Sequence, residues 1–154
     1  LVIPEIEKFK RSIEKNLYSS LYPISCLQSI IDNKGSITLI SSIAGEEFLG
    51  APVEYSVAKT SVISLAKNLS WVCKNKVRVN VISPGNIFFK GGTWDKKNKK
   101  NPQLVKKIIN DKVPLQRFGS PGEVADLVTY ISSEKANFIN GAVIRIDGGQ
   151  TVKI

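Results

Sequence analysis

The sequence predicts an α/β fold in which helices cover a parallel β-sheet. Residues 36–41 and 77–83 are short runs rich in apolar and β-branched side chains, and Gly or Pro bounds them, as is typical of buried strands. Residues 53–73 between them repeat apolar side chains at helical intervals. A strand, a helix and a second strand in this order form the repeating unit of a parallel sheet. We therefore expect a single domain over residues 1–154.

The N-terminal segment predicts one long helix. Apolar side chains recur at helical spacing over residues 4–31. Pro23 falls inside this segment, and it should kink or interrupt the helix because proline has no backbone N–H to donate.

The C-terminal part predicts two helices and a last strand. A short helix is expected near residues 102–111. The next helix begins with a capping box, in which Ser120 is the N-cap, Pro121 the first helical residue and Glu123 the residue that reaches back to the cap. This helix should end near Ser132, and residues 142–146 form the last strand.

Composition excludes several classes of protein. No apolar stretch is long enough to span a membrane, and charges occur too early in the N-terminal segment for a secretory signal. The chain has no His, which excludes His-based triads and His-ligated zinc. Its two cysteines, Cys26 and Cys73, fall in predicted helices and are expected to be buried free thiols of a cytoplasmic protein.

The charge is strongly positive, with 22 Lys and Arg against 13 Asp and Glu. Lysines gather in residues 95–101 and at Lys106 and Lys107. We interpret this run as a solvated loop, and the alternative is a surface for an anionic substrate or an acidic carrier protein. A nucleic-acid partner is not expected, because the run contains no interleaved aromatic residues or Arg.

Tyr55 and Lys59 are the candidate catalytic pair. Four residues apart on one helix, they share a face about one turn apart. A nearby cation favours the ionised phenol and lowers the pKa of a tyrosine, which otherwise lies near 10. Ser42 ends the preceding strand, where it can hold a substrate oxygen beside this pair. The plain alternative is a half-buried Tyr with a solvent-facing Lys, a spacing that a Lys-rich chain also produces by chance.

The order of these motifs resembles the short-chain dehydrogenase/reductase family. The family pattern of a Ser at a strand end, Tyr-x-x-x-Lys and a strand ending in Pro-Gly is similar to Ser42, Tyr55 with Lys59, and Pro84-Gly85. Further resemblance lies in the stretch from Arg117 to Ala125 and in the Asp147-Gly148-Gly149 turn, and it covers almost the whole chain. It implies a Rossmann-like, doubly wound parallel sheet, which in this chain is truncated to its C-terminal part.

The resemblance also implies the site residues. Tyr55 moves the proton, Lys59 bonds the nicotinamide ribose, and Ser42, favoured over Ser41, anchors the substrate oxygen. Asn16 would kink its helix and hold a water through its carbonyl, with a plain helix Asn as the alternative. The implied catalytic set is Asn16, Ser42, Tyr55 and Lys59, and the implied cofactor-binding set is Tyr55, Lys59, Pro84, Gly85 and Ile87.

The family's glycine-rich phosphate loop is missing from the sequence. Such loops supply the backbone amides that bind a pyrophosphate, so this polypeptide alone is expected to bind a dinucleotide poorly. Residues 88–112 correspond to the family's substrate lid. Within it Phe88, Phe89 and Trp94 either line the substrate pocket or form the core of the lid.

The function implied is hydride transfer between NAD or NADP and a small carbonyl or alcohol substrate. The partner expected besides the substrate is a second copy of the chain, in a homo-oligomer (a dimer or tetramer). Two alternatives stay open. One is a catalytically inactive fragment that serves as a binding or oligomerising module, and the other is a 3-oxoacyl-carrier-protein reductase.

Overall fold

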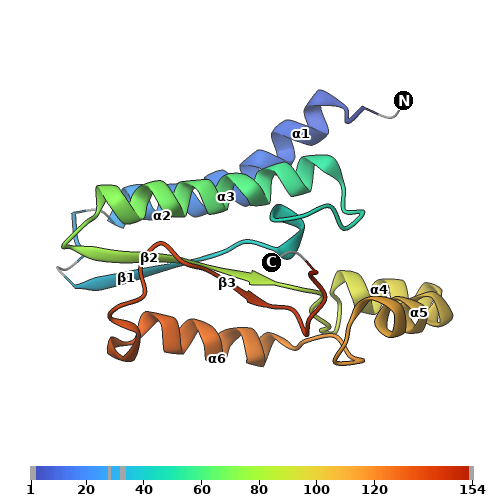
Figure 1. Ribbon diagram of the computed structural model, residues 1–154. Coiled ribbons are helices and arrows are strands. Elements are labelled where there is room, and N and C mark those ends of the chain that lie inside the picture. The colour runs from blue at the N-terminus through green and yellow to red at the C-terminus, as the bar shows by residue number, and fades with distance from the viewer. Residues whose placement is uncertain (1–2, 28, 32–33, 153–154) are drawn as a thin grey trace.

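In the part of the chain that the structure describes, a three-stranded parallel sheet lies between two helical layers (Figure 1). The computed structural model describes residues 3–27, 29–31 and 34–152. The strands lie side by side in chain order, as β1 (Gly35–Ile40), β2 (Val77–Pro84) and β3 (Val143–Ile146). Both neighbouring pairs are parallel. The predicted parallel α/β fold is therefore confirmed.

The largest core forms between the sheet and helix α3 (Val53–Val72). Val62 and Ala66 of α3 are buried against Val79 and Val81 of β2. Both faces of β2 are covered, which explains why its sequence is a nearly continuous buried run and not an alternation of apolar and polar residues.

The N-terminal helix has an irregular turn in its middle. It consists of α1 (Ile6–Ile13), a π-helical turn over Glu14–Tyr18, and α2 (Ser19–Leu27). α1 leaves the line of α2 in Figure 1, as expected where a π turn interrupts the regular hydrogen bonds.

Two details of the predicted N-terminal helix are wrong. The helix continues through Pro23, and the irregularity precedes the proline by about one turn. α2 also ends at Leu27, where the amides of Ile30 and Ile31 turn back to the Leu27 carbonyl. The predicted end at residue 31 was too late because apolar periodicity continues into this turn.

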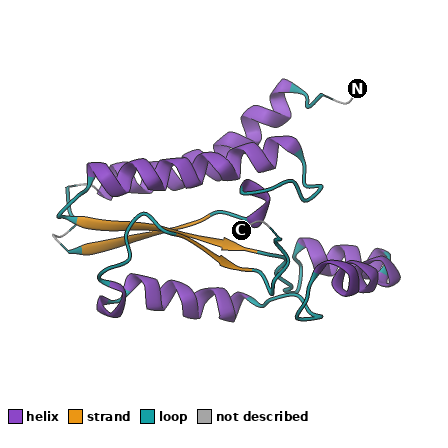
Figure 2. Cartoon of the chain, in the orientation of Figure 1, coloured by secondary structure: helices purple, strands orange, loops and turns teal. Residues whose placement is uncertain are grey.

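Helix α6 (Pro121–Ser132) covers the opposite face of the sheet (Figure 2). Its predicted capping box is present, since Ser120 and Glu123 each bond the backbone amide of the other. Arg78 of β2 reaches across to the end of α6, where its Nη1 donates to the Ile131 carbonyl at 3.0 Å. The sequence is thus sufficient to predict both ends of this helix.

Helices α4 (Thr93–Lys100) and α5 (Pro102–Lys112) lie beside the carboxyl ends of the strands (Figure 1). α5 was predicted, whereas α4 was expected to be a solvated loop. Asp95 explains the helix, because its Oδ2 accepts hydrogen bonds from the Gly91 amide and from Lys99, both at 2.8 Å. A carboxylate in the first turn paired with Lys four residues later favours a helix.

Both cysteines are free, but Cys26 is exposed and only Cys73 is partly buried, so the expected burial is wrong for Cys26. Among the described residues, no helix combines the length and apolar character needed to cross a membrane.

Candidate active site

Tyr55 and Lys59 lie on one side of α3, near its start. The Lys59 Nζ is 5.9 Å from the centre of the Tyr55 ring, and both side chains are partly buried. At this distance a cation interacts favourably with the face of an aromatic ring. The two groups that sequence reasoning paired are therefore close neighbours in space.

The Lys59 ammonium also reaches the end of β1. Its Nζ donates a hydrogen bond to the Ile40 carbonyl at 3.1 Å. Burial lowers the pKa of Lys59 below its usual value. A partly desolvated ammonium interacts with nearby dipoles and charges more strongly than one in water.

The two serines after β1 have different partners. Ser41 is buried, and its Oγ donates to the Lys59 backbone carbonyl at 2.8 Å. Ser42 is partly buried, and its Oγ accepts from the Ala44 amide at 3.2 Å, which leaves the hydroxyl hydrogen available to a substrate. Ser41 thus fixes the strand end to α3, and Ser42 is the better candidate for substrate contact.

A close backbone contact fixes the Ser42 turn against α3. The turn is a short 3₁₀ helix over Ile43–Gly45. A Cβ on Gly45 would meet the Lys59 carbonyl carbon and the Thr60 amide nitrogen, each at 2.8 Å. In return, the Thr60 hydroxyl donates to the Gly45 carbonyl at 2.7 Å. Gly45 and Thr60 therefore position Ser42 relative to the Tyr55 helix, and sequence reasoning assigned a role to neither.

Asn16 lies in the π turn and is tied to the start of α3 through Ser12. Its Nδ2 donates to the Ser12 carbonyl at 2.9 Å, and the Ser12 hydroxyl donates to the Glu54 carbonyl at 3.0 Å. The Asn16 carbonyl accepts from the Ser20 hydroxyl at 3.0 Å. Asn16 and Lys59 line the same groove of about 490 Å³ between the N-terminal helix and β1.

Pro84 ends β2 and Gly85 follows it, and the next residues, Asn86 and Ile87, line a different cavity. A Cβ on Gly85 would lie 2.7 Å from the Asp147 Cβ, so only Gly fits between β2 and the turn after β3. Ile87 forms a parallel bridge to Gly119, and both line a small cavity of about 90 Å³. The residues expected to hold the cofactor thus fall into two groups, with Lys59 at the groove and Ile87 at this smaller cavity.

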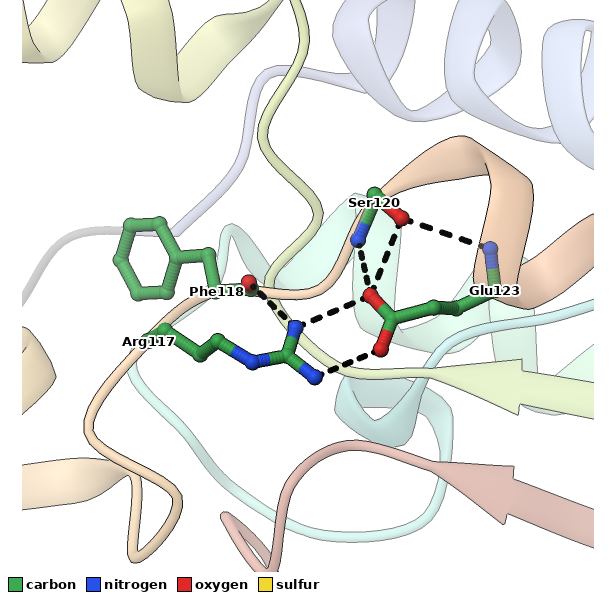
Figure 3. A network of polar contacts seen from close by, with 4 residues as sticks. All are labelled: Arg117, Phe118, Ser120 and Glu123. Carbon is green, nitrogen blue, oxygen red and sulfur yellow. Dashed lines mark hydrogen bonds and ion pairs between the residues drawn. The ribbon is translucent and has the colours of Figure 1, made fainter.

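A charged network holds the loop that carries Gly119 (Figure 3). The Arg117 guanidinium donates to both carboxylate oxygens of Glu123, at 3.0 and 2.7 Å. The Ser120 amide donates to Glu123 Oε2 at 2.8 Å. Hydrogen bonds from Arg117 and then from Ser120 lower the pKa of Glu123 to about 2.

The aromatic residues of the segment that was expected to be the substrate lid divide between core and surface. Trp94 packs on Phe118 with ring centres 4.5 Å apart, beside the buried Val105 and Val113. Phe88 and Phe89 are exposed. Of the two roles expected for these aromatics, Trp94 has the core role.

Comparison with known sequences identifies the family. Residues 3–151 match the family described as enoyl-(acyl carrier protein) reductase. The chain is 37% identical over 118 residues to isoepoxydon dehydrogenase patN of Penicillium expansum, and 75% of the chain and 45% of that protein are covered. It is 32% identical over 146 residues to the 3-oxoacyl-[acyl-carrier-protein] reductase FabG of Rickettsia conorii, with 93% and 58% covered. The chain belongs to the short-chain dehydrogenase/reductase family.

Solved structures share the fold. A short-chain dehydrogenase family protein from Francisella tularensis superposes with a TM-score of 0.84 at 28% identity, covering 97% of this chain and 64% of that one. A 4-hydroxyisoleucine dehydrogenase mutant, complexed with NADH and succinate, gives 0.81 at 28% identity, with 97% and 61% covered. The fold is therefore Rossmann-like, and the chain spans about half the length of the curated relatives it matches.

Proposed function

We propose that the protein is an NAD(P)-dependent oxidoreductase that interconverts a carbonyl and an alcohol, with Tyr55 as the acid/base. The observation that carries the proposal is the contact between Tyr55 and Lys59, where the ammonium lies 5.9 Å from the phenol ring at the open end of a parallel sheet. In open α/β sheets ligands bind outside the carboxyl ends of the strands, and Ser42 and Gly85 follow two such ends.

The residues present fit the nicotinamide-ribose part of the cofactor. The Tyr55 hydroxyl and the Lys59 ammonium are donors for ribose oxygens, and the segment from Pro84 to Ile87 supplies backbone groups for the carboxamide. No glycine-rich loop for the pyrophosphate occurs in the sequence, so the phosphate part needs residues from elsewhere. A bound nicotinamide supplies the hydride.

The chain's own residues then manage the proton and the substrate. In the reducing direction the carbonyl carbon gains a hydride, and its oxygen gains the Tyr55 proton. Ser42 donates a hydrogen bond to the same oxygen. The Lys59 cation stabilises the phenolate that remains on Tyr55. Asn16 is a positioning residue, because Ser12 links its amide to the Glu54 carbonyl next to Tyr55.

The substitution Tyr55→Phe tests this proposal in the intact protein. Removing a general acid lowers turnover by roughly 10²- to 10⁴-fold. NADH and NADPH affinity, measured by fluorescence titration, should change little, because Phe keeps the ring beside Lys59. Undiminished turnover in the variant would reject Tyr55 as the acid/base. An intact protein that binds neither cofactor would instead favour the inactive binding module.

A second candidate function is reduction of acyl groups on a carrier protein. The observation that favours it is the lysine-rich sequence of α4 and α5. These two helices lie beside the carboxyl ends of the strands (Figure 1). Lys99 pairs with Asp95, and the Lys97 Nζ lies 4.5 Å from the centre of the Trp94 ring. Lys96 and Lys100 are exposed, and no hydrogen bond within the described part of the chain engages either side chain. These two lysines are therefore the charges best placed to meet an acidic partner.

The proposal includes a homo-oligomer. α3 exposes the apolar side chains of Val53, Val57, Trp71 and Val72, of which Trp71 and Val72 are more than two-thirds exposed. These side chains lie at the two ends of α3, and we infer that they are contact points for a second copy of the chain. Sedimentation of the protein should give a dimer or tetramer, and a monomer at all concentrations would contradict this part of the proposal.

A further inference from the structure

Arg145 and Glu46 form an ion pair that joins the last strand to the turn after the first. Arg145 lies in β3, and its Nε donates to Glu46 Oε2 at 2.7 Å. Glu46 belongs to the turn that begins at Ser42, so the two partners are 99 residues apart in the chain. In the sheet, β2 lies between β1 and β3. The ion pair therefore links the end of β1 to β3 across the strand between them.

The ion pair lies on the face of the sheet that α3 covers. Val81 of β2 belongs to the core that the sheet forms with α3. Because side chains alternate between the two faces along a strand, Ser83 faces the same way as Val81. Ser83 is the register partner of Arg145, and side chains paired in register share a face. Arg145 is thus on the same face as the helix that carries Tyr55.

Glu46 is part of the hydrogen-bonded turn that carries Ser42. The Ser42 carbonyl accepts from the Gly45 amide at 2.9 Å, and the Ile43 carbonyl accepts from the Glu46 amide at 3.0 Å. Ser42 is the N-cap of this short 3₁₀ turn, and Glu46 is its C-cap. A displacement of the Glu46 backbone is therefore passed to Ser42 through the hydrogen bonds of the turn.

The Glu46 carboxylate depends on Arg145 because it is shielded from water. The exposed fraction of the Glu46 side chain is 13%, against 34% for Arg145. The second carboxylate oxygen, Oε1, is buried and accepts no hydrogen bond within the described part of the chain. A carboxylate that leaves water without a cation beside it is strongly unfavourable. Without Arg145, the Glu46 side chain is therefore expected to turn toward water and to displace the Ser42 turn.

The other contacts that hold this turn come from α3. The Ser41 hydroxyl, just before the turn, bonds the Lys59 carbonyl. Gly45 packs on the backbone of α3, and the Thr60 hydroxyl bonds the Gly45 carbonyl. The ion pair adds an attachment to a different element, β3. The turn is thus held from two directions, and the direction of the Ser42 hydroxyl depends on both.

We propose that Arg145 is a positioning residue for the reaction. Acting through Glu46, it holds the turn in the orientation in which the Ser42 hydroxyl donates to the substrate oxygen. The inference rests on the proposed function, because that function gives Ser42 its contact with the substrate. Arg145 itself touches neither substrate nor cofactor in this scheme, so its loss lowers turnover only through Ser42.

A double-mutant cycle in the intact protein tests this dependence on Ser42. The probe reaction is reduction of the acetoacetyl thioester of N-acetylcysteamine by NADH or NADPH. Arg145→Gln should lower kcat by roughly tenfold to a hundredfold, the effect of misplacing a group at the reacting atoms, and should leave KM for the cofactor unchanged. In a Ser42→Ala background the same substitution should change kcat by less than about twofold, because the hydroxyl that Arg145 positions is absent. Equal losses in the two backgrounds would overturn the proposal.

Glu46→Gln tests the route through the ion pair. It should lower kcat about as much as Arg145→Gln does, and the two substitutions together should lower kcat no further than either alone. If Arg145→Gln does not fold, this double variant replaces it, because it leaves no unpaired charge. Losses that multiply in the double variant would show that the two residues act independently, which contradicts the proposal.

Lys10→Gln is the matched control. It removes the cation of an exposed ion pair on α1, in which the Lys10 Nζ lies 2.8 Å from Glu7 Oε1. This substitution should leave kcat unchanged. A loss of kcat as large as that of Arg145→Gln would mean that net charge, and not the position of Arg145, sets the rate, and it would overturn the proposal.

The Ala44 amide reports the turn without any substrate, because it donates to the Ser42 Oγ at 3.2 Å. In the isotope-labelled intact protein, Arg145→Gln should shift the Ala44 amide resonance and speed its hydrogen exchange, whereas Lys10→Gln should change neither. An Ala44 amide that does not respond to Arg145→Gln overturns the proposal, even where kcat falls.

The same measurements separate this proposal from the proposed function. Turnover that needs Tyr55, with no response of the Ala44 amide, rejects the role of Arg145 and keeps the function. A response of the Ala44 amide in a protein whose turnover survives Tyr55→Phe rejects the function and keeps the attachment of the turn to β3. A wild type without turnover of the probe counts against the function in the same way.

Discussion

Gly45 lies against the backbone of Lys59 so closely that a Cβ on Gly45 would come within 2.8 Å of the Lys59 carbonyl carbon. This contact joins the turn that carries Ser42 to the helix that carries Tyr55. The Ser41 hydroxyl bonds the same Lys59 carbonyl, and the Thr60 hydroxyl bonds the Gly45 carbonyl. The distance between the two proposed catalytic segments therefore depends on a residue without a side chain.

Gly45→Ala should destabilise the fold and move Ser42. Its Cβ would meet backbone atoms, which cannot rotate away, so the turn and α3 must separate. Forcing extra atoms into a close-packed contact costs about 1–3 kcal/mol of unfolding free energy. Urea denaturation measures the loss, and the NMR shifts of Ser42 and Ala44 report the displacement.

Gly122→Ala is the matched control. Gly122 lies in the first turn of α6, and the nearest atom to its added Cβ is the Ser120 Oγ at 3.8 Å. Because Ala favours a helix over Gly, this variant should be unchanged or more stable by up to about 1 kcal/mol. Equal effects of the two substitutions would show that the Gly45 contact has no special role.

Glu123 should make stability depend on pH in the acid range. Hydrogen bonds from Arg117 and Ser120 lower the pKa of Glu123 to about 2 in the folded protein, from an ordinary value of 4.5. The stabilisation is thus present in full above pH 4.5 and is lost as the pH falls toward 2. The carboxyl ¹³C resonance of Glu123 should titrate with a midpoint of about 2.

Glu123→Gln supplies the comparison for this titration. The difference in unfolding free energy between wild type and variant should shrink as the pH falls from 5 to 2, because the protonated wild-type carboxyl then resembles the amide. Arg117→Gln should move the Glu123 midpoint up toward its ordinary value. A midpoint that stays near 2 without Arg117 would show that Ser120 alone sets the pKa.

Lys59 should make stability depend on pH in the alkaline range, again with an unfolding free energy that rises with pH. Burial lowers its folded-state pKa, so between the folded pKa and about 10.4 the unfolded chain binds more protons than the folded chain. The unfolding free energy of the wild type should therefore rise with pH relative to Lys59→Gln as the folded ammonium loses its proton. Lys67→Gln, on the same helix, corrects for the loss of one positive charge. If the unfolding free energy of the wild type falls or stays constant relative to that of Lys59→Gln in this pH range, burial does not lower the pKa of Lys59.

Most of the fold follows from local patterns. The strands, α3, α5 and α6 were predicted because apolar periodicity, a capping box and Gly or Pro boundaries act within short stretches of chain. Helix α4 was missed because lysine-rich sequence has no apolar periodicity, although the Asp95 and Lys99 pair four residues apart was a readable signal. The π turn at Glu14–Tyr18 has no signal in the apolar periodicity, and only the family resemblance indicated a kink at Asn16.

The site was less predictable than the fold. Spacing was enough to place Tyr55 and Lys59 on one helix face. It could not predict that Lys59 bonds the Ile40 carbonyl or that Gly45 packs on the same residue, because these contacts join segments 14 or more residues apart. The hydrogen bond of Lys59 goes to the last residue of β1, and apolar periodicity does not predict which carbonyl a lysine reaches.

Neutralising the exposed lysines of α4 tests the carrier-protein function. Lys96→Gln with Lys100→Gln should raise KM for a substrate linked to an acidic carrier protein by roughly three- to tenfold, since each exposed charge contributes up to about 1 kcal/mol to such an encounter. KM for the same acyl group on a short uncharged analogue should stay unchanged. Added salt should raise the wild-type KM for the carrier substrate and affect the double variant less, because screening weakens contacts between exposed charges.

The control for this variant removes the same charge at the other end of the sheet. Lys74 and Lys76 are exposed and precede β2, whereas α4 lies beyond its carboxyl end. Lys74→Gln with Lys76→Gln should leave KM for the carrier substrate unchanged, which separates a local docking surface from the effect of net charge. Equal changes in KM from the two double variants would mean that the overall positive charge attracts the carrier, and an unchanged KM in the α4 variant would reject the docking surface.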